Sequence, residues 1–210
     1  MTEIAHLVAT IFRKAAGRDR FVVAIAGPPG AGKSTLAEAL LPLFPEGSAV
    51  IVPMDGFHFD NAILAARNLL PRKGAPETFD VGGLAATLMR IRASEEGVAV
   101  PLFDRAADLA RAGAAVVPRA IRFVLVEGNY LLSDEAPWND LAPSFDFTIF
   151  LDVEEPVLER RLVERWLQHG HSHEQAVARA FSNDIPNARR VLACRRAADV
   201  EWRQDTKRTG

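Results

Sequence analysis

A glycine-rich segment near the N-terminus has the residue types and spacing that suit phosphate binding. Residues 27–35 read Gly-Pro-Pro-Gly-Ala-Gly-Lys-Ser-Thr and match the pattern G-x-x-x-x-G-K-[ST] at each fixed position. Glycines let the backbone curl so that successive N–H groups point inward at phosphate oxygens. Lys33 supplies an ammonium for the β- and γ-phosphates, and the Ser34 hydroxyl is placed for Mg²⁺. The pattern therefore predicts binding of a nucleoside triphosphate.

The context of this loop agrees with the motif. An apolar, β-branched run of strand length, residues 21–26, precedes it, and the run from Lys33 to Leu41 predicts a helix. This context disfavours the alternative, a Gly-Pro turn that happens to precede a helix. We expect ATP and Mg²⁺ as cofactors, although the motif leaves the choice among triphosphates open. The expected ATP contacts are Gly27, Gly30, Ala31, Gly32, Lys33, Ser34 and Thr35.

Further apolar runs predict the sheet that positions the loop. Helical patterns at residues 2–16, 81–93 and 156–169 separate several of these runs. Strands that alternate with helices indicate βαβ units and a parallel sheet covered on both faces, with the loops at the carboxyl ends along one edge. We expect an α/β fold in which a mainly parallel five-stranded sheet lies between two helical layers. The predicted strands are residues 21–26, 49–53, 121–126, 147–151 and 198–202.

Two acidic residues directly follow predicted strands. Asp55 comes after residues 51–54, and Glu127 comes after residues 123–126. In a parallel sheet both side chains would lie at the edge where the phosphate loop opens. Phosphoryl transfer needs one carboxylate to orient or deprotonate the acceptor hydroxyl and another to hold Mg²⁺ directly or through water. We expect the first role for Asp55 and the second for Glu127, whereas a turn or helix cap is the alternative for either residue alone.

A predicted helix that begins at Pro156 carries an uneven set of charges. Arg161, Arg165 and His169 recur at four-residue spacing, and Glu164 alone among their near neighbours offers neutralisation. An exposed charged face is the simpler interpretation. In the alternative that we prefer, a lid over about residues 156–182 brings Arg161 and Arg165 to the β- and γ-phosphates as charge develops. A helix to about Phe181 and then the stretch from Asn183 to Asn187 should follow, the latter without an assigned role.

Two long connections are expected to form the acceptor side. Residues 55–80 lie between a strand and a helix, and a long connection inside a compact domain is usually functional or disordered. Four aromatic residues disfavour disorder, and residues 61–70 could form a short helix. Residues 98–118 resemble an inserted hairpin. We therefore expect these two segments to shape the acceptor pocket.

Length, composition and net charge limit the class of protein. A chain of 210 residues with 49% hydrophobic and 25% charged residues suits one globular domain, which we place at residues 1–210. A net charge of −2 gives no electrostatic argument for nucleic acid, and no apolar run is long enough to span a membrane. A single cysteine, Cys194, and no visible secretory signal favour the cytoplasm. The N-terminal helix and Trp202 are candidate contacts of a homodimer.

Five motifs in one order resemble a known family. They are the phosphate loop, Met54-Asp55-Gly56-Phe57-His58, Gly74-Ala75-Pro76-Glu77-Thr78-Phe79-Asp80, Pro101-Leu102-Phe103-Asp104-Arg105 and Val126-Glu127-Gly128-Asn129-Tyr130. Together they resemble the P-loop kinases that include pantothenate kinase, uridine kinase and phosphoribulokinase, and most closely a bacterial branch named fructose transport system kinases. Uridine kinases carry a tyrosine-rich segment after the aspartate, so this chain is nearer the pantothenate kinase form there.

This resemblance implies a fold, a reaction and site residues. The fold would be a P-loop NTPase three-layer αβα sandwich with a helical lid. Asp55 would act as base toward the substrate hydroxyl, Glu127 would take the metal-linked role beside Ser34, and Lys33, Arg161 and Arg165 would assist transfer. The acceptor, a small molecule, would contact residues from four of the motifs. These are His58, Phe79, Asp80, Arg105, Asn129 and Tyr130.

Three functions from different classes fit the loop. The preferred one is an ATP- and Mg²⁺-dependent kinase that phosphorylates a hydroxyl of a small metabolite, a fructose-like sugar ahead of a nucleoside or pantothenate. The second is a nucleotide switch or hydrolase, such as a switch ATPase, that acts on a protein partner. The absence of an Asn-Lys-x-Asp guanine reader disfavours a GTPase, and a switch ATPase would have little use for an aromatic segment. The third is a structural protein without catalysis, which the intact set of Lys33, Ser34, Asp55 and Glu127 disfavours.

Overall fold

Five parallel strands form one sheet in the order β2-β5-β1-β6-β7. The computed structural model describes residues 3–203, so Thr2, the first residue of the predicted N-terminal helix, lies outside the described part. The three central strands are largely buried on both faces, as in most parallel sheets, whereas the two edge strands are partly exposed. The expected α/β fold with a parallel five-stranded sheet is confirmed. The strands are β1 (Phe21–Ala26), β2 (Ala49–Pro53), β5 (Phe123–Gly128), β6 (Phe147–Asp152) and β7 (Val200–Arg203).

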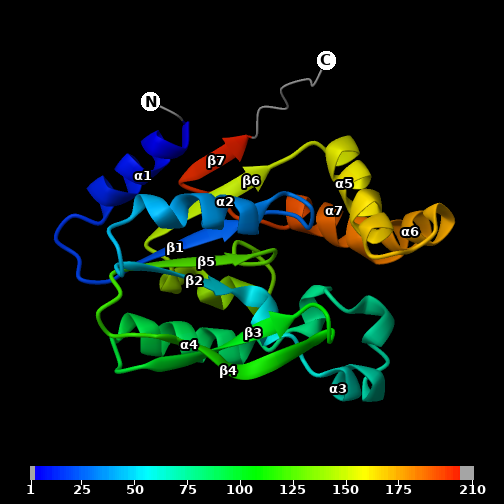
Figure 1. Ribbon diagram of the computed structural model, residues 1–210, viewed down its shortest axis with the longest axis horizontal. Coiled ribbons are helices and arrows are strands. Elements are labelled where there is room, and N and C mark those ends of the chain that lie inside the picture. The colour runs from blue at the N-terminus through cyan, green and yellow to red at the C-terminus, as the bar shows by residue number, and fades with distance from the viewer. Residues whose placement is uncertain (1–2, 204–210) are drawn as a thin grey trace.

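Helices cover both faces of this sheet, which gives the expected three layers (Figure 1). Val22 and Ala24 of β1 point into a core that includes side chains of α4, whereas Val23 and Ile25 point into a second core with α1 and α2. This alternation follows from the two-residue period of a strand. The helices are α1 (Glu3–Lys14), α2 (Lys33–Leu40), α3 (Asn61–Ala66), α4 (Val81–Arg92), α5 (Glu155–Gln168), α6 (His173–Arg179) and α7 (Ile185–Ala193).

The two long connections are ordered. Residues 98–118 contain an antiparallel pair, β3 (Val98–Asp104) and β4 (Leu109–Val117), as the expected hairpin requires. Residues 55–80 hold α3 between short 3₁₀ turns at Met54–Phe57, Leu70–Arg72 and Pro76–Thr78. Further 3₁₀ turns lie at Leu41–Leu43 and Trp138–Ser144. The hairpin and α4 lie on the same side of the main sheet in Figure 1.

The helical region after α5 is longer than predicted. The expected end near Phe181 is wrong, because a π-helical turn, Ala180–Asp184, leads without interruption into α7. Pro186 lies in the first turn of α7, directly after the π-helical turn. The stretch from Asn183 to Asn187 is therefore helical. No helix among residues 3–203 is long and apolar enough to cross a membrane.

Candidate active site

The phosphate loop connects the carboxyl end of β1 to the first turn of α2. Gly30 and Gly32 have φ values of +81° and +90°, a region that side chains with a Cβ rarely adopt. Gly32 caps α2 without a side-chain hydrogen bond, so the first-turn N–H groups and the positive helix end face the loop. The Lys33 ammonium donates to the Pro28 carbonyl at 3.0 Å, folding back over the same loop. This geometry suits an anion.

The sheet register brings Glu127 beside the loop. Strand β5 lies between β1 and β2, and Glu127 pairs with Ile25 on one side and with Pro53 on the other. The side chain of Glu127 is therefore held at the carboxyl edge of three adjacent strands. Asp55 follows Pro53 by two residues, within the 3₁₀ turn Met54–Phe57. Parallel pairing is thus the reason why two carboxylates 72 positions apart meet at one phosphate loop.

Lys33 and Glu127 are buried charges that stabilise each other. Burial lowers the pKa of Lys33, and the charges of Glu127 and Asp55 oppose that shift. Burial raises the pKa of Glu127, while Lys33 and a hydrogen bond from the Ser34 side chain oppose the shift. Isolated charges at these positions would be costly, so the pair is needed once the loop is folded.

Ser34 and Glu127 fit the needs of Mg²⁺. Their hydroxyl and carboxylate oxygens contact each other beside the loop and are hard ligands of the kind this ion prefers. Residues 3–203 contain no group of three or more His, Cys, Asp or Glu side chains able to enclose a metal ion. An open site suits Mg²⁺, which retains waters and binds phosphate oxygens rather than a closed protein cage.

Two cavities meet at these residues. The first, of about 140 Å³, lies against the phosphate loop and is lined by Gly30, Gly32, Lys33, Thr35, Asn129 and Arg165, among others. The second, of about 260 Å³, reaches under the hairpin and is lined by Glu38, Ile51, Pro53, Leu102 and Phe103. Both cavities share four lining residues, which are Ser34, Asp55, Arg105 and Glu127. Groups bound in the two cavities would therefore face each other across Asp55.

Helix α5 lies directly over the loop. The Arg161 guanidinium donates to the Gly30 carbonyl at 3.2 Å, and a Cβ on Gly30 would come within 3.3 Å of the Leu162 side chain. Arg165, one turn further along, lines the smaller cavity. The next residue, Trp166, donates through its indole N–H to Asp184 at 2.6 Å, which ties α5 to the π-helical turn. Both predicted arginines are thus on the loop side of α5.

The predicted acceptor residues are divided between the cavity and its supporting wall. Arg105 and Asn129 line the cavities. The His58 ring lies 3.9 Å from the Phe79 ring and 5.0 Å from the Phe103 ring, and its Nδ1 donates to the Asp55 carbonyl at 2.8 Å. His58 thereby supports the turn that carries Asp55, and neither it nor Phe79 is among the residues that line the two cavities.

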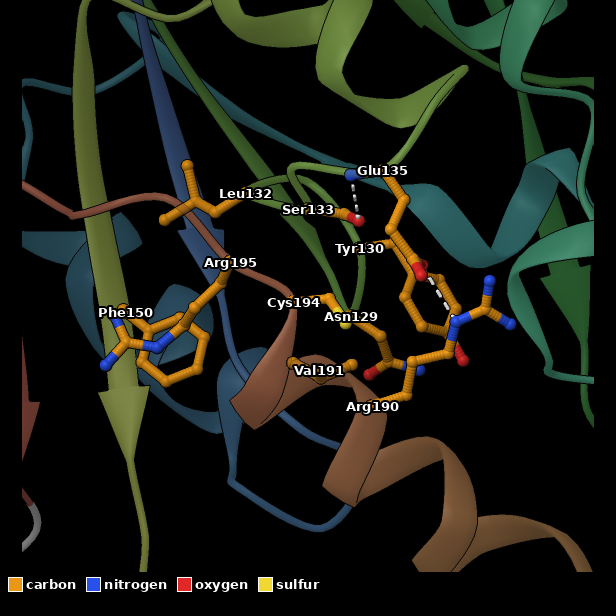
Figure 2. A pocket seen from close by; sticks show the side chains of 10 residues that line it. All are labelled: Asn129, Tyr130, Leu132, Ser133, Glu135, Phe150, Arg190, Val191, Cys194 and Arg195. Carbon is orange, nitrogen blue, oxygen red and sulfur yellow. Dashed lines mark hydrogen bonds and ion pairs between the residues drawn. The ribbon is translucent and has the colours of Figure 1, made fainter.

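Asp80 and Tyr130 also lie outside the lining of these cavities. Asp80 accepts from the Gly83 N–H at 2.8 Å and caps α4. The Tyr130 hydroxyl donates to the Gly74 carbonyl at 2.7 Å, and burial raises the pKa of this phenol above its usual range. Tyr130 and Cys194 line a separate cavity (Figure 2), whose volume of about 10 Å³ is too small for a metabolite. Direct acceptor contacts by His58, Phe79, Asp80 and Tyr130 stay predictions.

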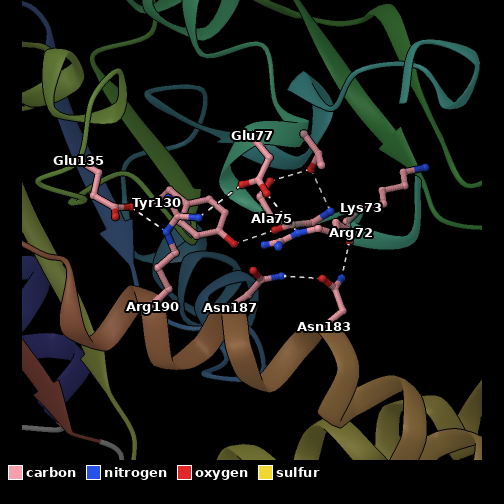
Figure 3. A network of polar contacts seen from close by, with 11 residues as sticks. Arg72, Lys73, Ala75, Glu77, Tyr130, Glu135, Asn183, Asn187 and Arg190 are labelled. Carbon is pink, nitrogen blue, oxygen red and sulfur yellow. Dashed lines mark hydrogen bonds and ion pairs between the residues drawn. The ribbon is translucent and has the colours of Figure 1, made fainter. Parts of the chain in front are cut away.

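Sequence reasoning missed several residues of the site. Glu38 was recognisable in principle, because it lies four positions after Ser34 on the same face of α2. Ile51, Leu102 and Phe103 line the larger cavity but had no signal beyond strand-like apolar runs. Asn183 donates to the Lys73 carbonyl at 2.8 Å, a contact across 110 positions (Figure 3). The pairing of such distant residues cannot be read from local patterns.

Known proteins identify the family of this chain. No protein-family model matches it. YggC of Escherichia coli (strain K12) is 40% identical over 185 residues, which are 86% of this chain and 76% of that protein. A protein named "Putative uridine kinase C227.14" from Schizosaccharomyces pombe is 35% identical and covers 81% of this chain and 77% of its own length.

A crystal structure has the same fold at higher identity. It is that of a "putative fructose transport system kinase" from Silicibacter sp. TM1040, with 47% identity, a TM-score of 0.89, and coverage of 96% of this chain and 100% of that one. The chain belongs to the P-loop kinases of the pantothenate kinase and uridine kinase group. This P-loop kinase is thus an ATP-dependent enzyme with an alcohol group as acceptor, and it uses Mg²⁺.

The relation to pantothenate kinases covers part of those proteins. The pantothenate kinase of Sorangium cellulosum is 37% identical over 164 residues, which are 75% of this P-loop kinase and 53% of the relative. The chain therefore spans about half the length of the curated pantothenate kinases that it matches. The expected kinase family and the expected cofactors are confirmed.

Proposed function

We propose that this protein transfers the γ-phosphate of ATP to a hydroxyl of a small metabolite, with a fructose-like sugar ahead of a nucleoside or pantothenate. The observation that carries this proposal is the shared wall of the two cavities. A triphosphate on the loop would point its γ-phosphate at Asp55, Ser34 and Glu127, and these residues also bound the larger cavity. An acceptor in that cavity would present its hydroxyl at the same place.

In this proposal each residue of the site has a separate role in phosphoryl transfer. Asp55 accepts the proton of the acceptor hydroxyl, whose oxygen forms a bond to the γ-phosphorus while the bond from that phosphorus to the β–γ bridging oxygen breaks and ADP leaves. Lys33 and the first-turn N–H groups of α2 hold the β- and γ-phosphates. Ser34, and Glu127 through water, would hold Mg²⁺, which neutralises phosphate charge when bound.

Two arginines complete the donor side in this proposal. Arg161 contacts the loop carbonyl of Gly30, and Arg165 extends into the smaller cavity. Guanidinium groups at these points would offset the charge that spreads over the equatorial oxygens during transfer. We therefore assign α5 and the helical segment after it, about residues 156–182, to a lid that closes over ATP. A cytoplasmic location, the absence of a nucleic-acid partner and a homodimer are further parts of the proposal.

The charges of the larger cavity favour a neutral acceptor. Its wall holds the three carboxylates of Glu38, Asp55 and Glu127 against the one guanidinium of Arg105. Glu38 has no ion-pair partner among the described residues, so its carboxylate is available to hydroxyl donors of an acceptor. A sugar would donate hydrogen bonds there, whereas a carboxylate-bearing acceptor would meet like charge. Ile51, Leu102 and Phe103 supply an apolar surface for the carbon skeleton.

An acceptor panel tests the proposal. ADP release with MgATP is measured with D-fructose, uridine and pantothenate, and mass spectrometry identifies the phosphorylated product. The best acceptor should raise turnover at least about tenfold, about 1.4 kcal/mol. Asp55→Asn should remove about 10²- to 10⁴-fold of that turnover, the usual contribution of a general base. Asp140→Asn, which changes an exposed carboxylate outside both cavities, is the matched control.

Two results would contradict the proposal. A preference for pantothenate over D-fructose in kcat/KM would overturn the neutral acceptor. Equal turnover with and without every small molecule, together with stimulation by a protein fraction, would instead favour a nucleotide-switch ATPase.

A further inference from the structure

The side chain of Lys73 is nearly enclosed, although lysine side chains usually extend into water. Its exposed fraction is 13%, and its ammonium lies 5.0 Å from the centre of the Phe103 ring. The ammonium donates to the Asn61 side-chain oxygen at 2.7 Å and to the Asp108 carbonyl at 2.5 Å, and it lies 3.0 Å from the Asp108 carboxylate. Three acceptors therefore match the three protons of the ammonium.

These partners hold the turn of the β3–β4 hairpin. Asp108 directly precedes β4 and has a φ of 51°, and its carbonyl also accepts from the Asn61 side-chain amide at 3.1 Å. Phe103, near the end of β3, and Arg105, the first residue of the turn, line the larger cavity. The Lys73 side chain thus joins α3 to the part of the hairpin that covers the proposed acceptor site.

Other contacts of the hairpin turn are weaker or internal. Arg105 is paired with Asp55 at 3.8 Å, but 58% of its side chain is exposed, and such pairs contribute little to stability. Asp104 accepts from the N–H groups of Ala106 and Ala107, which shapes the turn without attaching it to another element. The shielded Lys73 ammonium, together with the Asn61 side chain that it contacts, is therefore the main polar attachment of the turn.

Lys73 is itself fixed at its backbone (Figure 3). The Asn183 side-chain amide donates to the Lys73 carbonyl at 2.8 Å, and Asn187 donates to the Asn183 side-chain oxygen at 3.3 Å. The neighbouring Gly74 carbonyl accepts from the Tyr130 hydroxyl at 2.7 Å. Contacts with the π-helical turn, α7 and the segment just after β5 thus hold the backbone from which the Lys73 side chain extends to the hairpin.

We propose that Lys73 is a positioning residue that pins the β3–β4 turn over the larger cavity and so sets the affinity for the acceptor. Lys73 lines neither cavity, so it acts through Phe103 and Arg105 rather than on the acceptor itself. The effect on affinity rests on the proposed function of that cavity. The attachment of the turn by Lys73 is independent of that function.

Hydrogen–deuterium exchange of the full chain tests the attachment. Lys73→Met, which keeps the chain length and removes the ammonium, should raise the exchange rates of peptides over residues 102–111 at least about tenfold, because local opening governs such exchange. Exchange in α2 should not change. Arg72→Met is the matched control, because the adjacent Arg72 pairs with Glu77 at 3.1 Å and forms no ion pair with the hairpin in the described part of the chain. Unchanged exchange at residues 102–111 would overturn the proposal.

A second variant tests whether the effect of Lys73→Met comes from the lost contact rather than from a general loss of stability. Asp108→Asn removes the carboxylate of the ion pair, which belongs to a side chain that is 63% exposed. Asparagine, like aspartate, tolerates the positive φ of this position. It should raise exchange at residues 102–111 in the same direction but less than Lys73→Met. The effect of the double variant should be smaller than the sum of the two single effects, because both changes act on one contact. Additive effects of the two substitutions on exchange would contradict a single contact between Lys73 and Asp108.

Steady-state kinetics test the consequence for the acceptor. With the fastest acceptor among D-fructose, uridine and pantothenate, Lys73→Met should raise the acceptor KM at least about tenfold, whereas the KM of ATP and kcat should change less than about twofold. A fall in kcat with an unchanged acceptor KM would overturn the positioning role. If none of the three is phosphorylated by the wild type, the proposed function fails, and the exchange experiment alone decides the attachment.

Discussion

The guanidinium of Arg105 lies 3.8 Å from the carboxylate of Asp55, at the point where the two cavities of the site meet. Arg105 comes from the hairpin and Asp55 from the turn after β2, so the contact joins the proposed acceptor side to the edge of the main sheet. A cation beside the proposed base can orient the acceptor hydroxyl or offset charge on the transferred group. This contact therefore links the hairpin to the chemistry.

Arg105→Met should lower kcat/KM for the acceptor by about tenfold, roughly the value of one charge-assisted hydrogen bond. The melting temperature should hardly change, because the Arg105 side chain is 58% exposed and such ion pairs add little stability. Acceptor kinetics and thermal denaturation measure the two effects. Arg111→Met, which removes an exposed arginine paired with Asp104 on the same hairpin, should leave kcat/KM unchanged. A lower melting temperature with normal kinetics would assign Arg105 a structural role.

Arg165→Met should reduce kcat by about 100-fold or more, since a guanidinium at the transferred phosphoryl group typically contributes about 10³-fold or more. Binding of ATP, measured by calorimetry, should weaken far less, because the charge that Arg165 meets develops mainly in the transition state. Arg160→Met is the control on the same helix, where Arg160 is exposed and lies 3.8 Å from Glu164. Equal losses in the two variants would indicate damage to α5 rather than a role in transfer.

Gly56→Ala should destabilise the protein by about 1–3 kcal/mol, the usual cost of inserting a methyl group into a packed site. A Cβ at Gly56 would collide with the backbone carbonyl of Pro101, and a backbone atom cannot rotate away as a side chain can. Urea unfolding measures the change. Gly82→Ala in α4 meets no atom closer than 3.7 Å and should stabilise by up to about 1 kcal/mol, because alanine favours a helix. Similar effects of the two substitutions would refute the close approach.

His58 should make the free energy of unfolding depend on pH. Burial lowers the pKa of His58 below its ordinary value of about 6.5, although Asp55 opposes the shift through its charge and its carbonyl. The unfolded chain then binds the proton more tightly than the folded protein does. The contribution of His58 to stability is therefore greatest above pH 6.5 and decreases as the pH falls through and below that value.

Urea unfolding at pH 7.5 and pH 5.5 measures this linkage. His58→Asn keeps an N–H donor for the Asp55 carbonyl but does not titrate, so it should lose less stability between the two pH values than the wild type. His6→Asn changes an exposed histidine of α1 and should leave the wild-type difference as it is. Parallel pH profiles for His58→Asn and the wild type would contradict a buried, neutral His58.

Much of the fold could be predicted because its signals are local. Strand-length apolar runs and helical periodicity gave the order of all five strands along the chain and most helices, and residues 98–118 were recognised as an inserted hairpin. The continuation of the helix from Ala180 into α7 was missed, because Pro186 resembles the end of a helix in the sequence. The π-helical turn that leads into α7 is not visible in the sequence. The kinase family was likewise readable, since its motifs are short and ordered.

The sequence by itself determined the donor half of the candidate site. The proposed phosphate contacts of Gly32, Lys33 and Ser34 depend on local backbone geometry and adjacent side chains, so nine consecutive residues carry that information. The parallel arrangement of the strands then made the approach of Asp55 and Glu127 to the loop predictable, because the carboxyl ends of such strands share one edge.

The tertiary structure alone decided the acceptor half. Glu38 and Phe103 line one cavity, Tyr130 is turned into the core, and Lys73 bridges Asn183 and Asp108. These contacts join residues 35 and 110 positions apart. Each depends on how two long connections pack against helices from the other end of the chain. Packing of that kind has no local signal in the sequence, since the free energy of each contact exists only once the whole sheet and its covering helices are assembled.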